Sequence, residues 1–184
     1  MDEFLSQLTK SIPALRRYAY ALVRNSSTAD DLVQDCLERG LRKRSQWKGE
    51  GSLNSWLYRI LSNIQLNHYR ASNHNPLDKS SEITEKLAMA PQFQKPANQL
   101  DRLYLQDLDK AIAELPDEQK QILLLITLEG LGYREVAKIM EIPSGTVMSR
   151  LSRARENIRK KMATSKAASS SGSDVRAPHI RRIK

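Results

Sequence analysis

Hydrophobic residues recur along most of the chain at the three- and four-residue spacing that is typical of α-helices. Three such stripes lie within residues 12–23, 32–41 and 53–64, and the polar stretches "NSST" and "WKGEGS" separate them. Helices that each have one apolar face can bury a common core. The pattern therefore predicts a three-helix domain over residues 1–71.

Polar residues in front of the stripes indicate where these helices begin. Ser27, followed three residues later by Asp30, fits a capping box for the second helix. Ser52 stands where it can cap the third helix. Cys36 lies in the second stripe and is the only cysteine, so we expect a small core residue and no internal disulfide.

The helical period is lost over residues 72–98, which contain three prolines and scattered polar residues. This composition predicts a flexible linker. Fully extended, a segment of this length reaches at most about 95 Å. The parts on either side are thus expected to be able to act several nanometres apart.

A second helical domain is predicted over residues 99–163. The almost wholly apolar segment "QILLLITLEGLG" supplies its central helix, and Pro116 with two acids suits the start of that helix. A short helix "YREVAKIM", the break "EIPS" and a longer basic helix then form a helix-turn-helix pattern. The predicted fold class is therefore all-α, with two small helical domains joined by a flexible linker. Residues 164–184, which are rich in Ser and Ala and basic, predict a disordered tail.

The long basic helix divides into two faces. Ser144 is expected to cap it, and one buried stripe is predicted at Val147, Leu151, Ala154 and Ile158. On the preceding helix, Val136, Ala137 and Met140 are predicted to face inward. Residues 133–161 contain eight basic and three acidic residues, a net charge of +5. A recognition helix needs this division, because side chains early in the helix reach base edges while arginines contact phosphates.

The whole chain is also basic, with 30 Lys and Arg against 21 Asp and Glu and a net charge of +9. This balance favours a polyanionic partner, either nucleic acid or an anionic membrane surface. No apolar run approaches the roughly 18 residues of a membrane span. The N-terminus also lacks the layout of a signal peptide, so we expect a cytosolic protein without membrane insertion.

Enzymatic chemistry is not indicated. The three histidines, His68, His74 and His179, lack partners at metal-ligand spacing. The sequence contains no glycine-rich phosphate loop and no nucleophile–base grouping. We therefore predict no catalytic residues, no metal and no cofactor.

The third helix carries a polar face that suits single-stranded nucleic acid. Arg59, Asn63, Asn67 and Arg70 are spaced to share one face, beside Tyr58 and Tyr69. Amides flanked by arginines and aromatics are able to read exposed bases by hydrogen bonding and stacking. The alternative is an ordinary polar face in water.

Three segments in this order resemble the extracytoplasmic-function (ECF, group four) sigma factors of bacterial RNA polymerase. They are "ADDLVQDCLERGLRK", "WKGEGSLNSWLYRILSN" and "LPDEQKQILLLITLEGLGYREVAKIMEIPSGTVMSRLSRARENIRK". The resemblance covers about residues 10–162. It implies that residues 1–71 form sigma region 2, that residues 99–163 form region 4, and that the protein works in the bacterial cytoplasm.

The resemblance implies three partners. Core RNA polymerase would be bound through its β′ clamp helices and its β subunit, promoter DNA through the −10 and −35 elements, and an anti-sigma factor would hold the protein in a stress response. The residues matching the polymerase-binding segment are Asp30, Asp31, Leu32, Val33, Gln34, Asp35 and Arg39.

Promoter contacts follow from the same resemblance. The residues matching the part that melts and reads the −10 element are Lys48, Glu50, Ser52, Trp56, Arg59, Asn63 and Asn67. Those expected at the −35 element are Arg134, Thr146, Met148, Ser149, Arg150, Ser152, Arg153 and Arg155. The chain departs from the family pattern at Glu141, where glycine is frequent in the turn, and at Asn67, where aspartate is frequent.

Two other classes of protein remain open from the sequence. One is a helix-turn-helix repressor or activator that binds DNA without polymerase, which would be expected to carry a dimerisation helix or a ligand domain. The other is a sigma-like decoy that sequesters an anti-sigma factor. A decoy would not need the basic recognition helix or Asn63.

Overall fold

The computed structural model describes residues 3–47, 49, 51–72 and 99–170, and these ranges contain helices and no strand. The predicted all-α fold is confirmed. The helices are α1 (Glu3–Val23), α2 (Ser26–Arg42), the short 3₁₀ helix η1 (Arg44–Gln46), α3 (Leu53–Ser72), α4 (Gln99–Ala113), α5 (Asp117–Thr127), α6 (Tyr133–Met140) and α7 (Ser144–Ser170).

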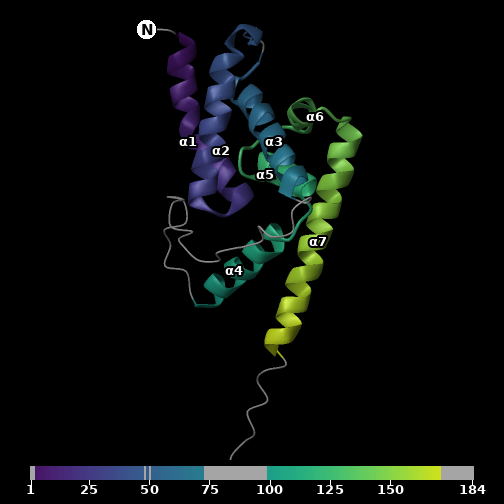
Figure 1. Ribbon diagram of the computed structural model, residues 1–184. Coiled ribbons are helices and arrows are strands. Elements are labelled where there is room, and N and C mark those ends of the chain that lie inside the picture. The colour runs from purple at the N-terminus through teal and green to yellow at the C-terminus, as the bar shows by residue number, and fades with distance from the viewer. Residues whose placement is uncertain (1–2, 48, 50, 73–98, 171–184) are drawn as a thin grey trace, which may run out of the picture.

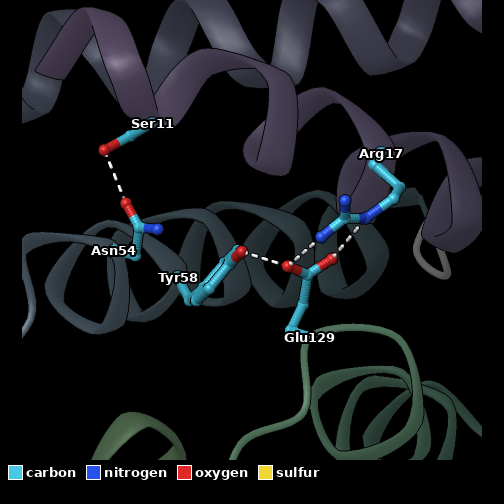
Figure 2. Close-up of polar contacts among 5 residues, drawn as sticks. All are labelled: Ser11, Arg17, Asn54, Tyr58 and Glu129. Carbon is cyan, nitrogen blue, oxygen red and sulfur yellow. Dashed lines mark hydrogen bonds and ion pairs between the residues drawn. The ribbon is translucent and has the colours of Figure 1, made fainter.

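Helices α1, α2 and α3 pack on one another and form the N-terminal half. Their apolar stripes meet in a core whose fully buried side chains include Leu15, Tyr18, Leu57 and Leu61. The rings of Tyr18 and Tyr58 pack edge to face with their centroids 5.2 Å apart. Ser11 on α1 also donates a hydrogen bond to Asn54 on α3 at 2.5 Å (Figure 2). The predicted three-helix arrangement is therefore present.

Gly40 lies where α2 passes closest to α3. A Cβ atom built on Gly40 would lie 3.1 Å from Cδ2 of Leu57 and 3.7 Å from the ring of Trp56. The lack of a side chain at this position lets the two helices approach each other.

Two of the predicted helix starts differ in the structure. Asn25, not Ser27, caps α2, because its Oδ1 accepts the backbone N–H of Thr28 at 2.9 Å. Ser144 is the first residue of α7 rather than its cap, and the carbonyl of Pro143 accepts the N–H groups of Thr146 and Val147. Each cap lies just upstream of the serine that the pattern favoured.

The C-terminal half is built around α5, which packs against both α6 and α7, while α4 packs against α7. Ile122 and Leu125 of α5 are completely buried, as predicted from their apolar segment. In Figure 1, α7 runs along one side of this half and continues beyond it. This helix ends at Ser170, so residues 164–170, which the composition assigned to a disordered tail, are helical.

The two halves pack directly on each other. Helix α1 contacts α5, and α3 contacts α6 (Figure 1). A single hydrophobic cluster contains buried residues of both halves. The predicted linker, apart from Ser72, and residues 171–184 of the predicted tail lie outside the described residues.

Candidate nucleic-acid interface

Helices α6 and α7 form the predicted helix-turn-helix and pack against each other. The inner faces meet through Val136 and Ile139 of α6 and Val147, Leu151 and Ala154 of α7, all of them buried. Ala137, Met140 and Ile158 are only partly buried, and Ile139 is an inward residue that the pattern analysis missed. Its spacing of three from Val136 was the signal that could have identified it.

The outer face of α7 carries four side chains that were predicted to face a DNA groove. Met148, Ser149, Ser152 and Arg153 are all exposed, and Met148 shows 52% of its surface. The hydroxyl of Ser149 donates to the carbonyl of Thr146 at 3.1 Å, which holds the first turn of this face. The helix thus presents an exposed strip of two serines, one methionine and one arginine.

The arginines that flank this strip differ in exposure and in whether they already pair with a carboxylate. Arg134 and Arg155 are exposed at the edges of the helix-turn-helix. Arg150 instead turns back toward α5, where its Nη2 lies 2.7 Å from Oε2 of Glu118. An exposed guanidinium can reach a phosphate without losing a protein partner, whereas Arg150 would have to share or leave Glu118.

A pocket of about 340 Å³ lies between α2, η1 and α3 in the N-terminal half. Its lining residues are Arg39, Lys43, Gln46, Trp56, Arg59, Ile60 and Asn63. Three residues predicted at the −10 element therefore gather at one hollow, together with Arg39 of the predicted polymerase segment. Lys43, which follows α2, and Gln46 of η1 were not singled out, because they lie outside the periodic stripe of α2 and a single turn of 3₁₀ helix has no readable periodicity.

Aromatic packing behind the pocket supports Trp56, the aromatic residue that lines it. The rings of Trp47 and Trp56 lie 5.8 Å apart, and Phe4 contacts Trp56 edge to face at 6.5 Å. The guanidinium of Arg44 lies over the Phe4 ring at 5.3 Å. These contacts hold the ring of Trp56, which lines the pocket together with Arg39, Lys43 and Arg59, and an aromatic ring among basic side chains suits a base and its phosphate.

The remaining residues predicted at the −10 element are spread along the same helix. Ser52 is exposed and directly precedes α3, and Asn67 is exposed one turn beyond Asn63. Lys48 and Glu50, and the side chains of Tyr69 and Arg70, lie outside the described residues.

The acidic segment of α2 has an outer and an inner face. Asp30, Asp31 and Gln34 are exposed, and Asp35 and Arg39 are partly exposed. Leu32 and Val33 are buried in the core at 2% and 4% exposure, where they hold the helix in place, and their predicted contact with polymerase stays a prediction. Asp30 accepts both ends of the Arg16 guanidinium, at 2.8 and 3.0 Å.

Glu129 joins three helices across the boundary between the halves (Figure 2). It follows α5, and its carboxylate accepts two hydrogen bonds from Arg17 of α1, at 3.1 and 2.7 Å, and a third from the hydroxyl of Tyr58 of α3. The hydrogen bond to Glu129 raises the pKa of Arg17. Burial, with help from Glu129, raises the pKa of Tyr58, so both donors keep their protons.

Two further ion pairs cross the same boundary. Arg24, just after α1, pairs with Asp109 of α4 and donates to its backbone carbonyl at 3.0 Å. Arg59 of the pocket pairs with Glu141, which ends α6 in the left-handed conformation, with φ 55° and ψ 42°. The sequence showed Glu141 where the family frequently has glycine, which adopts this conformation more easily, but nothing in the sequence paired Glu141 with Arg59.

Within the described ranges, no three His, Cys, Asp or Glu side chains gather in a way that could hold a metal ion. The described helices are also each too short or too polar to cross a bilayer.

A bipartite helical protein with an exposed basic helix in one half and a pocket lined by Arg39, Lys43 and Arg59 in the other has features that are typical of nucleic-acid-binding proteins. Models of two known families match the same two halves. Residues 8–62 match the Sigma2 domain of PhyR, and residues 105–158 match Sigma-70, region 4.

Relatives of known class extend the match to most of the chain. The ECF RNA polymerase sigma factor EcfG of Rhodopseudomonas palustris is 29% identical over 85% of this chain and 83% of its own length. The RNA polymerase sigma-H factor of Pseudomonas aeruginosa is 32% identical over 75% of each chain. The chain belongs to the ECF family of RNA polymerase sigma factors, which are regulatory factors of transcription initiation.

Solved structures agree with this family. The sigma factor RpoE of Bartonella quintana, solved in complex with the anti-sigma factor NepR, matches with a TM-score of 0.70 and 29% identity over 89% of this chain and 98% of that one. The anti-anti-sigma factor PhyR of the same organism, solved with NepR, matches with a TM-score of 0.58 and 16% identity over 86% of this chain and 50% of that one. The second likeness is one of fold.

Proposed function

We propose that this protein binds core RNA polymerase and directs it to promoters by reading a −35 element with the C-terminal half and melting a −10 element with the N-terminal half. The observation that supports the proposal is the exposed strip Met148, Ser149, Ser152 and Arg153 on a helix that buries Val147, Leu151 and Ala154 on its opposite face. A helix with this division can enter the major groove with its early residues on base edges.

The second reading element is the pocket lined by Trp56, Arg59 and Asn63. A base unstacked from the duplex would pack on the aromatic wall, and the Asn63 amide would hydrogen-bond to its edge. Unstacking costs a few kcal/mol, and contacts with polymerase and promoter would supply it. Arg134 and Arg155, with Thr146 and Arg150, would hold the backbone at the −35 element.

Two protein partners belong to the proposal. The exposed acids Asp30, Asp31 and Asp35 on α2 would contact the basic β′ clamp helices, because opposite charge steers such encounters. An anti-sigma factor would restrain the protein, as NepR binds the related RpoE. We place this regulation in a stress response of the bacterial cytoplasm. The chain would act without a cofactor or catalytic chemistry of its own.

The test is in vitro transcription with bacterial core RNA polymerase on a DNA library randomised over both promoter elements. Sequencing of the transcript 5′ ends is expected to reveal one preferred promoter that is used only when this protein is present. Arg153→Ala should reduce discrimination at one −35 position by about 10- to 100-fold, the value of one good base contact. Initiation without sequence preference, or none at all, would refute the proposal.

A second candidate is a decoy that captures an anti-sigma factor, favoured by the match of residues 8–62 to the PhyR domain. This role needs neither the exposed strip on α7 nor the cationic pocket. A decoy would bind the anti-sigma factor equally well after Arg153→Ala and Asn63→Ala, and would leave the transcription assay silent. The sigma factor would lose promoter choice in the first variant and −10 melting in the second.

A further inference from the structure

We propose that a hollow between α6 and α7 takes the C5-methyl group of a thymine in the −35 element, and that Tyr133 and Met148 are the residues that recognise this methyl group. The inference rests on the proposed function and deepens it, because it names a base and two side chains at the surface that would read the −35 element. The resemblance to sigma factors places Met148 at this element without a base and leaves Tyr133 out.

The hollow has a volume of about 200 Å³ and opens on the helix-turn-helix. Its lining residues are Tyr133, Met148, Leu151, Ser152, Arg155, Glu156 and Arg159. Met148, Ser152, Arg155 and Arg159 follow one another along α7 at spacings of four, three and four, so these exposed side chains form one row on the helix. The hollow is therefore continuous with the strip that would enter the major groove.

Two large apolar side chains at this hollow are exposed to water. Tyr133 shows 39% of its surface and Met148 shows 52%, whereas Leu151, which also lines the hollow, is buried at 3%. A methyl group that packed between Tyr133 and Met148 would remove apolar surface from water on both partners. The walls of the hollow thus favour an apolar group as the occupant.

Thymine carries such a group at the edge that a recognition helix meets. Its major-groove edge presents the C5-methyl group beside the O4 acceptor, and no other DNA base carries a methyl group there. Ser152 places a hydroxyl, which can donate to O4, at the same hollow as the apolar side chains. The pairing of an apolar wall with a hydroxyl therefore matches thymine among the four bases.

The charges around the hollow suit DNA as the source of the methyl group. Arg155 and Arg159 are exposed where the row continues towards the C-terminal end of α7. Glu156, the one acid among the lining residues, pairs with Arg159 and lies 3.8 Å from the amine of Lys160, so two cations offset its charge. Arginines beside a base-reading surface can contact phosphates, whereas an apolar protein segment would bring no charge to them.

The backbone holds Tyr133 in place before any ligand arrives. Tyr133 is the first residue of α6, and the N–H of the preceding Gly132 donates to Oε2 of Glu135 at 2.9 Å. Val136 of α6 and Val147 of α7 are completely buried where these two helices pack on each other. The two walls of the hollow therefore have a fixed spacing, which lowers the entropy lost when a base binds.

The test uses the holoenzyme formed from bacterial core RNA polymerase and this chain, on the preferred promoter found in the transcription assay. Each thymine of the −35 element, on either strand, is replaced in turn by uracil, which lacks only the methyl group. At one position the affinity of the wild-type holoenzyme is expected to fall about three- to fivefold, the value of one buried methyl group. Thymines outside the −35 and −10 elements serve as the control for the DNA and should tolerate uracil.

Variants assign the effect to the hollow. Met148→Ala and Tyr133→Ala should each bring the thymine-to-uracil affinity ratio at that position below about twofold, because each removes an apolar wall. Tyr133→Phe keeps the ring and should keep the wild-type ratio. The matched control is Leu128→Ala, since Leu128 is an exposed apolar residue of the same half that does not line the hollow. Far-UV circular dichroism checks that every variant keeps its helices.

A −35 element made only of G·C pairs would overturn this inference and leave the proposed function standing. The same holds if every thymine of the element can become uracil without loss, or if folded Met148→Ala and Tyr133→Ala keep the wild-type ratio. Initiation without any preferred promoter would instead refute the proposed function, and this inference with it.

Discussion

The guanidinium of Arg150 on α7 lies 2.7 Å from the carboxylate of Glu118 on α5, while Arg155 on the same helix is exposed. The two arginines have equal charge, yet only one of them is already engaged with protein. Their contributions to DNA binding should therefore differ.

We expect Arg155→Ala to lower the dependence of promoter affinity on salt by about one unit of log–log slope, as for the loss of one phosphate contact. Arg150→Ala should lower the slope by less than half as much, because Glu118 already neutralises that charge. The measurement is holoenzyme–promoter affinity over a salt series. Arg16→Ala, which removes an equal charge from the other half, is the control, and equal slopes for the two α7 variants would contradict the expectation.

The acidic face of α2 gives a second prediction. Asp31→Ala combined with Asp35→Ala should weaken binding to core RNA polymerase by about tenfold, mainly through slower association, because these charges steer the encounter. Stopped-flow association kinetics at two salt concentrations check the result. Glu114→Ala, an acid of the other half, should leave the rate unchanged. An unaltered association rate for the double variant would remove α2 from the polymerase interface.

The close approach of α2 and α3 gives a prediction about stability. Gly40→Val should destabilise the protein by about 1–3 kcal/mol, since a larger side chain would press on the fully buried Leu57. Urea denaturation followed by circular dichroism measures the loss. The control is Gly145→Val, because a Cβ atom at Gly145 meets nothing within 4 Å. It tests the alternative that a branched residue destabilises a helix without any clash. Equal losses in the two variants would contradict the packing explanation.

Burial raises the pKa of the Cys36 thiol from about 9 to about 12. Between these values the thiol of the unfolded chain loses its proton while that of the folded chain keeps it. The stabilisation is thus complete below about pH 9 and declines with rising pH, by about 1.4 kcal/mol per pH unit. Urea denaturation at pH 8.5 and pH 10 measures this decline. Cys36→Ala should show a smaller decline, and an equal one would assign the effect to other groups.

Most of the helices were predictable because each buries one face. A buried face requires apolar residues that recur with the 3.6-residue period of the helix. The stripe at Val147, Leu151 and Ala154 is the clearest case, and all three side chains are buried. The same period correctly placed Met148 and Arg153 on the outside. Burial and exposure on one helix are local consequences of spacing, so they can be read from the sequence.

Features that depend on one atom or on distant partners could not be read in this way. The choice of Asn25 over Ser27 as the cap of α2 depends on the local backbone path, since both residue types are good caps. The pairing of Arg17 with Glu129 joins residues 112 positions apart, and nothing in either neighbourhood marks the other. The burial of Leu32 and Val33 was readable from their stripe, whereas their expected place in a polymerase-binding segment comes from the family resemblance and stays a prediction.

One hydrophobic cluster contains buried residues of both halves, and this determines how the chain would behave if the halves separated. Surface that is dry in the packed form meets water once the halves part, and exposed apolar surface favours self-association. A chain whose halves separated without a partner would therefore be expected to self-associate. A partner that separated the halves would therefore be expected to cover the apolar surface that it exposes.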